Sequence, residues 1–310
     1  MTGFAVVNPR SSNGRTRRDW PQIEAALHAV YPELSIAMTR RRGEATELVR
    51  EALREGHSEI IAIGGDGTIN EAVNGFFDPE GSIAPDAVFA FVTSGTGGDF
   101  RKTFDHEPGS LAAIARLKNA SVRPIDVGRI SCVSLMGESV VRYFVNIASF
   151  GLSGVIVDWV NRARIAKLFG GSFAFQFHSA RALLFYREQM VRIRVDGDFD
   201  EIASIATVAV ANGRYFGGGM HVAPNALPDD GVFDVVVMGG GRRAVSDLKL
   251  LYTGEHIDRP GVQVLRGKKI MAAPVAETGG HAVLIELDGE SAGRLPATFE
   301  ILPRALNVRC

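Results

Sequence analysis

The sequence predicts an α/β part followed by a mainly β part. Between residues 4 and 92, short apolar runs alternate with helix-like stretches, a pattern typical of a parallel sheet covered on both faces. From residue 125 onward, strand-like runs bounded by glycine, aspartate or proline dominate. The chain has 310 residues, 46% of them hydrophobic, so it can bury a sizeable core and favours two domains over one.

The elements of the α/β part follow from the order of its segments. The expected strands are 4–7, 34–38, 60–63 and 88–92, and the expected helices are 17–30, 44–54 and 69–76. Ligands of such sheets bind at the carboxyl ends of the strands. Three polar or glycine-rich loops leave those ends, at 8–14, 64–68 and 93–99.

The second part is expected to be mainly antiparallel. Its strand-like runs are 140–148, 190–195, 203–211, 232–238 and 282–287, and helical segments interrupt them at 155–169 and 173–186. The boundary near residue 125 depends only on this change of pattern, because the sequence has no internal repeat and no low-complexity tract.

Charge and composition exclude several classes of protein. The formal net charge of -1 and a pI near 6.7 provide no global basic field, so we expect no nucleic-acid partner. Cys132 and Cys310 have neither zinc-site nor redox spacing. The start of the chain does not resemble a secretory signal, and no apolar run approaches the ~18 residues of a membrane span. We therefore expect a cytoplasmic protein whose membrane contact is peripheral.

The segment 59–71 reads as strand, phosphate loop and helix. Gly64, Gly65 and Gly67 let the backbone approach a ligand closely, and the N–H groups at the start of the next helix favour an anion. Asp66 would repel phosphates. It therefore implies either a metal ion between the two or a structural hydrogen bond to the loop.

A second loop of small residues, 93–100, follows the strand that ends at Val92 and also contains an aspartate. Either loop alone could be tight-turn chemistry. Two such loops at two strand ends favour phosphate binding. The sequence lacks the P-loop and dinucleotide fingerprints, which weakens those interpretations.

Taken in order, the motifs resemble the signature of the diacylglycerol kinase catalytic-domain family, in particular the bacterial soluble lipid kinases. The similarity covers essentially the whole chain. The motifs are residues 8–12 (NPRSS), 64–68 (GGDGT), 95–100 (GTGGDF), 212–219 (NGRYFGGG), 224–226 (PNA) with 229–231 (DDG), and 287–290 (LDGE).

The resemblance implies a fold and a reaction. The fold is an N-terminal α/β domain like that of NAD kinases and phosphofructokinases, and a C-terminal β-sandwich domain. The expected ranges are 1–125 for the nucleotide-binding domain, with 293–310 as a segment that could complete it, and 126–292 for the β-sandwich that receives the lipid. The implied reaction is ATP- and magnesium-dependent transfer of a phosphoryl group to a lipid hydroxyl, in phospholipid metabolism.

Site residues are carried over motif by motif. Asp288 would be the general base, and Glu290 would face the nucleotide and its metal. The residues implied to bind ATP are Asn8, Thr39, Gly64, Gly65, Asp66, Gly67, Thr68, Asn70 and Thr96. Asp66, Asp99 and Asp126 would form the catalytic magnesium network, and Leu227, Asp230 and Val232 would hold a structural magnesium ion.

Simpler interpretations of these residues stay open. Asp-Gly usually means a hairpin turn with a surface charge, so Asp288 could be only that. Asp126 could be a strand-end cap, and Asp230 could belong to an ordinary acidic turn. Relatives commonly have glycine at Ser12, asparagine at Gly98 and proline at Thr93, and the loss of a side chain at Gly98 weakens the expected ATP geometry.

The acceptor is less well specified than the nucleotide. Residues 155–168 could form a helix at a membrane surface or a core helix, and the apolar residues of 173–186 could line an acyl-chain cleft or an interior. The first hypothesis is a lipid kinase acting on diacylglycerol, a sphingoid base or ceramide, or phosphatidylglycerol. The second is a regulatory nucleotide-binding protein of the same fold, and a soluble-metabolite kinase is a weaker third. A homodimer is left open.

Overall fold

The computed structural model describes residues 3–94, 98–162, 186, 188–239, 248–275 and 282–310. They divide into two compact units. The first comprises Met1–Val127 with Pro303–Cys310, and the second comprises Gly128–Leu302. The ranges expected from the sequence differ from this division by two residues at the first boundary, 125 against 127, and by ten at the return, 293 against 303.

The first unit is a parallel sheet with helices on both faces. Its strands are β1 (Gly3–Val7), β2 (Leu34–Met38), β3 (Glu59–Gly64) and β6 (Val88–Thr93), and they run side by side in the order β6-β3-β1-β2. The end of β16 (Glu290–Arg309) adds a further parallel strand beside β6, with Asn307 opposite Val88. The α/β prediction is confirmed.

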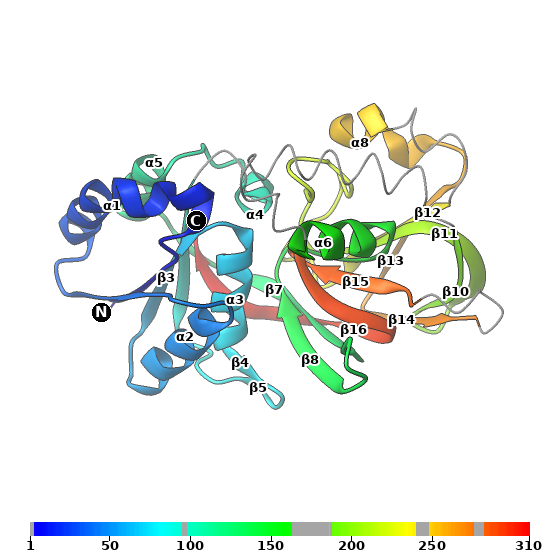
Figure 1. Ribbon diagram of the computed structural model, residues 1–310, viewed down its shortest axis with the longest axis horizontal. Coiled ribbons are helices and arrows are strands. Elements are labelled where there is room, and N and C mark those ends of the chain that lie inside the picture. Colours follow the sequence, from blue (N-terminus) through cyan, green and yellow to red (C-terminus); the bar gives the residue numbers. More distant parts are fainter. Residues whose placement is uncertain (1–2, 95–97, 163–185, 187, 240–247, 276–281) are drawn as a thin grey trace. The chain divides into compact units, whose positions relative to one another are not determined.

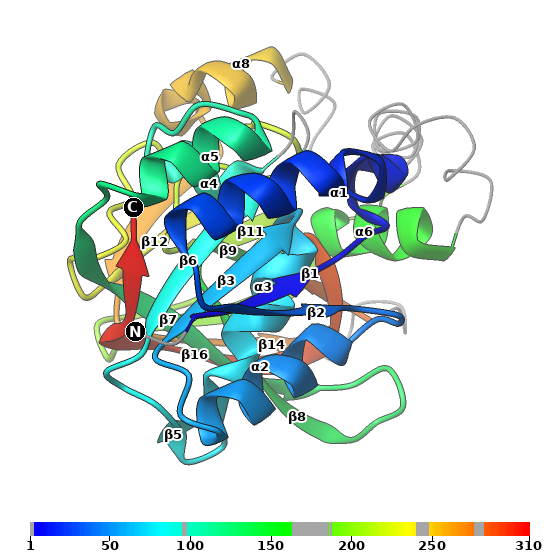
Figure 2. The same ribbon diagram turned by 90° about the vertical axis from the view of Figure 1, so that its left-hand side faces the viewer.

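Helices cover this sheet in two layers, which Figure 2 shows most clearly. α1 (Ser11–Val30) and α5 (Ser110–Leu117) lie on one face, and α2 (Glu44–Arg54) and α3 (Asp66–Gly75) lie on the other. Fully buried aliphatic side chains of β1, β3 and β6 fill the space against α1 and α5. The remaining elements are the short α4 (Asp99–Thr103) and a small hairpin of β4 (Phe77–Asp78) and β5 (Gly81–Ser82).

The first turn of α1 is not a right-handed helix. Ser12, Asn13 and Gly14 have φ values of 52°, 56° and 81°, so the regular helix starts after Gly14. This irregular turn is the loop that leaves the carboxyl end of β1.

The second unit is an antiparallel β structure (Figure 1). Pairing closes six strands into a ring in the order β9-β11-β10-β14-β16-β15, and β12 with β13 continues from β11. The strands are β7 (Val122–Val133), β8 (Ser139–Phe144), β9 (Ile147–Gly151), β10 (Gln189–Val195), β11 (Phe199–Ala211), β12 (Phe233–Gly239), β13 (Val262–Gly267), β14 (Lys269–Pro274) and β15 (Leu284–Leu287).

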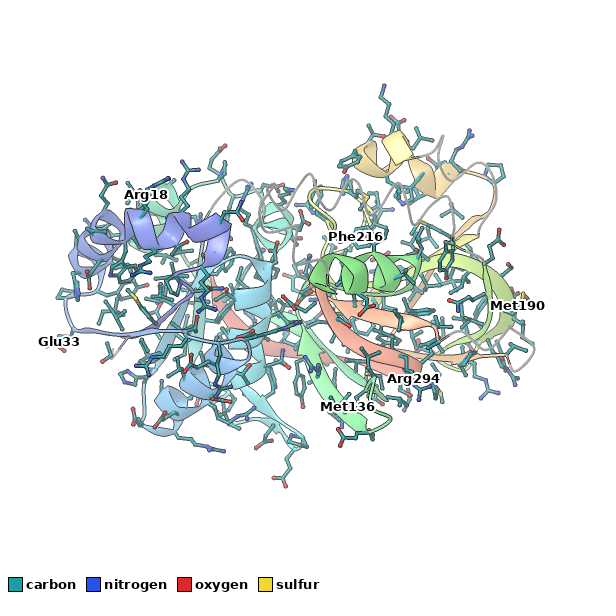
Figure 3. All side chains as sticks on the ribbon, in the orientation of Figure 1. Arg18, Glu33, Met136, Met190, Phe216 and Arg294 are labelled. Carbon is teal, nitrogen blue, oxygen red and sulfur yellow. The ribbon has the colours of Figure 1, made fainter. Side chains whose placement is uncertain are left out.

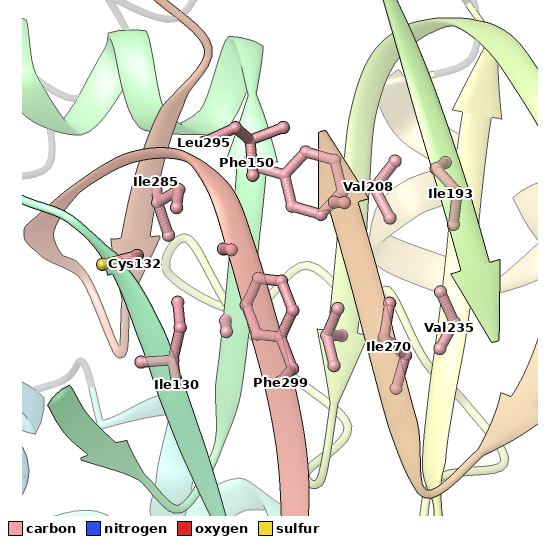
Figure 4. Packing of buried hydrophobic residues seen from close by; sticks show 14 of the residues in the cluster. Ile130, Cys132, Phe150, Ile193, Val208, Val235, Ile270, Ile285, Leu295 and Phe299 are labelled. Carbon is pink, nitrogen blue, oxygen red and sulfur yellow. The ribbon is translucent and has the colours of Figure 1, made fainter. Parts of the chain in front are cut away.

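Alternate residues of these strands form the core (Figure 4). Phe150 stacks on Phe299 with ring centroids 6.0 Å apart, and Ile193, Val208 and Ile270 pack in the same cluster. This period-two burial agrees with the antiparallel strands that the sequence pattern indicated and with the β-sandwich that the family resemblance implied.

Two expected elements differ from the prediction. The run 140–148 forms two strands, β8 and β9, because the strand is interrupted at Val145 and Asn146. The backbone N–H groups of these two residues bind a side chain that is described below. Helix α6 (Leu152–Arg162) occupies the start of the helix expected at 155–169, and the rest lies outside the described residues, as does 173–185. Also present are α8 (Leu248–Thr253) and a 3₁₀ helix, Glu255–Asp258. Within the described part of the chain, no helix is both long and apolar enough to span a bilayer.

Candidate active site

The turn between β3 and α3 is a tight glycine turn that leads directly into the helix. Gly64 has no room for a side chain, because an added Cβ would collide with the side chain of Thr68. Gly65 is the N-cap of α3 and makes no side-chain capping bond, so the first turn of the helix presents backbone N–H groups. Such an end favours a negatively charged ligand.

Polar residues follow the neighbouring strand ends, and one of them contacts this turn. Asn8 follows β1, and its Nδ2 donates to Thr68 Oγ1 at 3.0 Å. Thr39 follows β2, and its N–H donates to the carbonyl of Val7 at 2.8 Å. Asn8, Thr39 and Thr68, all predicted from the sequence to bind a nucleotide, thus come from the carboxyl ends of adjacent parallel strands. Asn70 is buried one turn into α3, 5% exposed.

Asp66 joins the two glycine-rich loops. Its Oδ2 accepts the backbone N–H of Asp99 at 3.0 Å, and its Oδ1 accepts that of Phe100 at 3.3 Å. These are the first residues of α4, so the Asp66 carboxylate caps a helix that lies 33 residues further along the chain. The sequence analysis left open a metal ion or a hydrogen bond to the 64–68 loop itself, whereas these two hydrogen bonds go to the second loop.

A cluster of hydroxyl groups also connects the first and third loops, and the sequence analysis missed it. Ser94 Oγ lies 2.9 Å from Ser11 Oγ and 2.7 Å from Thr16 Oγ1. Ser12, where the family resemblance led us to expect glycine, donates from its hydroxyl to the carbonyl of Ser94. The signal available was the density of Ser and Thr in two loops expected at one edge of the sheet.

The other two aspartates of the predicted magnesium network make separate contacts. Asp99 accepts a hydrogen bond from Lys102 Nζ at 2.8 Å. Asp126 is fully buried, and its Oδ1 accepts the backbone N–H of Arg304 at 2.7 Å, which fixes the returning end of β16. Among the described residues, no three His, Cys, Asp or Glu side chains form a metal-sized cluster.

Asp288 and Gly289 form the two-residue turn between β15 and β16. Their φ values of 48° and 85° are both positive, as in the type I′ turns that join hairpin strands. The Asp-Gly pair therefore is a hairpin turn, as the simpler interpretation held. Its carboxylate is not a surface charge, however, because Asp288 is only 8% exposed.

Three consecutive backbone N–H groups bind the Asp288 carboxylate. Oδ1 accepts those of Asn146 and Ile147 at 3.1 and 3.0 Å, and Oδ2 accepts that of Val145 at 3.3 Å. These bonds stabilise the ionised carboxylate and fix its orientation. They also account for the break between β8 and β9.

The NGRYFGGG motif holds the same segment from the other side. Asn212 Nδ2 donates to the carbonyl of Val145 at 2.8 Å, and Asn146 Nδ2 donates to that of Tyr215 at 2.7 Å. Two motifs separated widely in sequence, 212–219 and 287–290, thus bind one short stretch of backbone at residues 145–147.

The predicted structural magnesium residues lie on the 227–232 turn. Asp230 forms an ion pair with Arg266, and its Oδ1 accepts the N–H of Val232 at 3.2 Å. Arg266 is also 3.7 Å from Asp234, whose pKa is raised by burial. A protein cation thus already faces Asp230, and Leu227 is 55% exposed. Thr96 lies outside the described residues.

Comparisons with known proteins cover both units. The description "Diacylglycerol kinase catalytic domain" matches residues 2–130, and "YegS C-terminal NAD kinase beta sandwich-like domain" matches residues 146–310. The chain belongs to the diacylglycerol kinase catalytic-domain family. The predicted fold, an NAD kinase-like α/β domain and a C-terminal β-sandwich, is thereby confirmed.

Individual members of the family align along nearly the whole chain. A diacylglycerol kinase from Staphylococcus haemolyticus is 27% identical over 307 residues, 98% of this chain and 86% of that protein. A candidate diacylglycerol kinase from Bacillus anthracis str. Sterne has a similar crystal structure, with a TM-score of 0.76 at 23% identity, covering 99% of this chain and 94% of that one. An NAD kinase from Archaeoglobus fulgidus in complex with ATP has a TM-score of 0.51 at 15% identity, covering 100% and 94%.

Proposed function

We propose that this family member is a lipid kinase that transfers the γ-phosphoryl group of ATP to a lipid hydroxyl. The observation that supports it most is the N-terminus of α3, with glycine as its N-cap, at the carboxyl end of β3, where Asn8 donates a hydrogen bond to Thr68. Phosphoryl transfer depends mainly on positioning and charge stabilisation, and these are what such a loop supplies. Relatives named diacylglycerol kinases support diacylglycerol as the first acceptor to test.

Each loop has a distinct task in this proposal. The N–H groups at the start of α3 bind phosphate oxygens, and the Asp66 bridge holds the 98–100 backbone beside them. Asp288, oriented by the N–H groups of 145–147, accepts the proton of the acceptor hydroxyl as attack proceeds, for which an ionised carboxylate suffices. Glu290 follows directly after the turn, and a role toward the nucleotide and its metal remains what the family resemblance implies for it.

Magnesium fits some of the predicted ligands better than others. Mg²⁺ usually binds through one or two carboxylates together with substrate phosphates, so a cluster of three carboxylates is not required. The Asp66 carboxylate, whose two oxygens offer about four lone-pair sites, fits such a role. Asp126 fits poorly, because it is fully buried against Arg304, and so does Asp230 beside Arg266. When bound, the ion would neutralise charge on the phosphates.

Contact with a membrane surface is also part of the proposal. Leu135 and Met136 occupy the tip of the β7–β8 hairpin and are 49% and 90% exposed (Figure 3). Apolar side chains at such a tip can enter the interface of a bilayer. Replacing both with serine should weaken co-sedimentation with phosphatidylglycerol vesicles, and unchanged binding would contradict this contact.

The deciding experiment is a transfer assay with γ-labelled ATP and magnesium. Mixed micelles would contain diacylglycerol, ceramide, a sphingoid base or phosphatidylglycerol, and labelled products would be separated by chromatography. We expect labelled phosphatidic acid from diacylglycerol, and loss of the signal with EDTA. Label found only on water-soluble metabolites would reject the lipid kinase.

A regulatory nucleotide-binding protein is the second candidate, and Gly98 favours it. This residue is the N-cap of α4 with φ 86°, and it carries no side chain where the family resemblance led us to expect asparagine. Calorimetric binding of ATP without transfer to any lipid in the panel would support this candidate. Transfer that increases in Gly98→Asn, relative to a measurable wild-type rate, would support the kinase.

A further inference from the structure

Glu286 is a buried carboxylate that the motif does not include. It lies on β15, two residues before Asp288, and is 3% exposed. Its neighbours in sequence, Ile285 and Leu287, point into the hydrophobic core. Glu286 therefore points to the opposite face of the strand, where α6 packs closely: an added Cβ on Gly154 of α6 would collide with the backbone of Leu284.

Both carboxylate oxygens of Glu286 accept hydrogen bonds. Ser149, directly opposite on β9, donates its hydroxyl to Oε1 at 2.5 Å, and the backbone N–H of Gly289 donates to Oε2 at 2.9 Å. Ser153 Oγ on α6 lies 2.7 Å from Ser149 Oγ. A chain of polar contacts thus connects α6 and β9 to the second residue of the Asp288-Gly289 turn.

The backbone around this turn needs such support. Asp288 has a positive φ, a conformation that residues other than glycine rarely adopt. The pairing of β15 with β16 also shifts register between Ile285 and Glu286, where Ala292 is the extra residue. The Asp288 side of the turn is held by the backbone at 145–147, and the hydrogen bond from the Gly289 amide to Glu286 anchors its other residue, next to the irregular pairing.

We propose that Glu286 is a positioning residue that, through the Gly289 amide and with Ser149, holds Asp288 and Glu290 in place for phosphoryl transfer. This inference rests on the proposed function. Glu286 acts on the turn and not on the substrate. It holds the turn through hydrogen bonds and not through its charge, so a side chain with the same shape and bonding capacity can replace it.

The test compares two replacements of similar size. Glu286→Gln can still accept the Gly289 N–H with its carbonyl oxygen and donate to Ser149 with its amide, whereas Glu286→Met can do neither. We expect kcat for lipid phosphorylation to fall about tenfold or more in Glu286→Met, with KM for ATP within about twofold, and to stay within about threefold of wild type in Glu286→Gln. Ser149→Ala should lie between them. The control is Asp200→Asn. Asp200 is an exposed residue of the same unit that forms an ion pair with Arg192.

The outcomes separate this inference from the proposed function. A wild-type enzyme that labels no lipid refutes the proposed function. If the wild type is active and Glu286→Met has a normal kcat, the positioning role is overturned. It is also overturned if kcat falls as much in Glu286→Gln as in Glu286→Met, and that result would mean that the negative charge of Glu286 is itself used. Hydrogen exchange at the Gly289 amide, measured by NMR without substrate, tests the contact directly. We expect protection in wild type and Gln and faster exchange in Met, and equal exchange in all three would overturn the inference.

Discussion

The carboxylate of Asp66 accepts the backbone N–H of Asp99 at 3.0 Å. One side chain thereby connects the glycine-rich loop after β3 to the loop after β6. Asp66 thus has a contribution to the fold in addition to any contribution to nucleotide binding, and the two contributions can be measured separately.

Asp66→Asn should lower turnover by about 10²-fold or more while the protein remains folded. Asparagine can accept one of the two N–H groups but leaves the other, which is buried, without an acceptor, so we expect a loss of about 1–3 kcal/mol in stability, and Asp66→Ala should lose at least as much. Steady-state kinetics and thermal melts would separate these effects. Asp19→Asn, an exposed aspartate on α1 of the same unit, is the matched control. Near-normal turnover in folded Asp66→Asn would remove this residue from the reaction.

Asp288→Asn should impair both activity and stability. Its amide group would face at least one of the backbone N–H groups that the carboxylate now accepts. Leaving a buried donor without an acceptor costs about 1–3 kcal/mol, and we expect that loss in urea unfolding together with a fall in turnover of about 10²-fold. Asp200→Asn should change neither. An Asp288→Asn variant that is less stable but fully active would show that the residue only holds the turn.

His106 should make the first unit less stable in acid. Burial, and then the positive charges of Arg116 and Arg123, lower the pKa of this imidazole from 6.5 to about 4, and Asp105 opposes the shift. Between these two values the unfolded chain binds a proton that the folded chain does not, so the free energy of unfolding falls as the pH falls through this window. The contribution is fully present above the window.

Thermal melts across that pH range would measure the effect. His106→Gln should reduce the loss of melting temperature on acidification, and His28→Gln, on the exposed side of α1, should not. An unchanged pH dependence in His106→Gln would contradict this assignment.

Arg309→Met should destabilise the first unit. Arg309 binds Glu59 through Nε at 2.5 Å and Nη2 at 3.1 Å, and Tyr31 donates its hydroxyl to the same carboxylate at 2.9 Å. Glu59 is only 1% exposed, so the variant leaves a buried charge without its cation, at a cost of about 3–5 kcal/mol. Urea unfolding would measure it.

The double variant Arg309→Met with Glu59→Leu should recover much of the stability lost in Arg309→Met, because both charges are then removed. Arg18→Met, whose side chain is 71% exposed, should have little effect. If Arg309→Met is as stable as wild type, water must solvate the Glu59 carboxylate in place of the arginine, and the prediction is wrong.

The sequence by itself determined the elements whose residues signal their own state. β1, β2, β3 and β6 are short apolar runs, and α2 begins and ends where the prediction placed it, at residues 44 and 54. The ordered motifs identified the family. They are turns whose backbone conformation depends on local residue type, such as the glycines at positions 64 and 289. These signals are local, so a single sequence carries them.

Only the tertiary structure decided which groups the candidate site residues contact. That Asp66 caps α4, that Asp288 binds the N–H groups of 145–147, and that Glu286 holds Gly289 all depend on pairing between segments far apart in sequence. The identity of an acidic residue does not reveal whether its carboxylate contacts a metal, a substrate or a backbone amide. Its partner is chosen by the register of the strands and the packing of the helices, which no local pattern specifies.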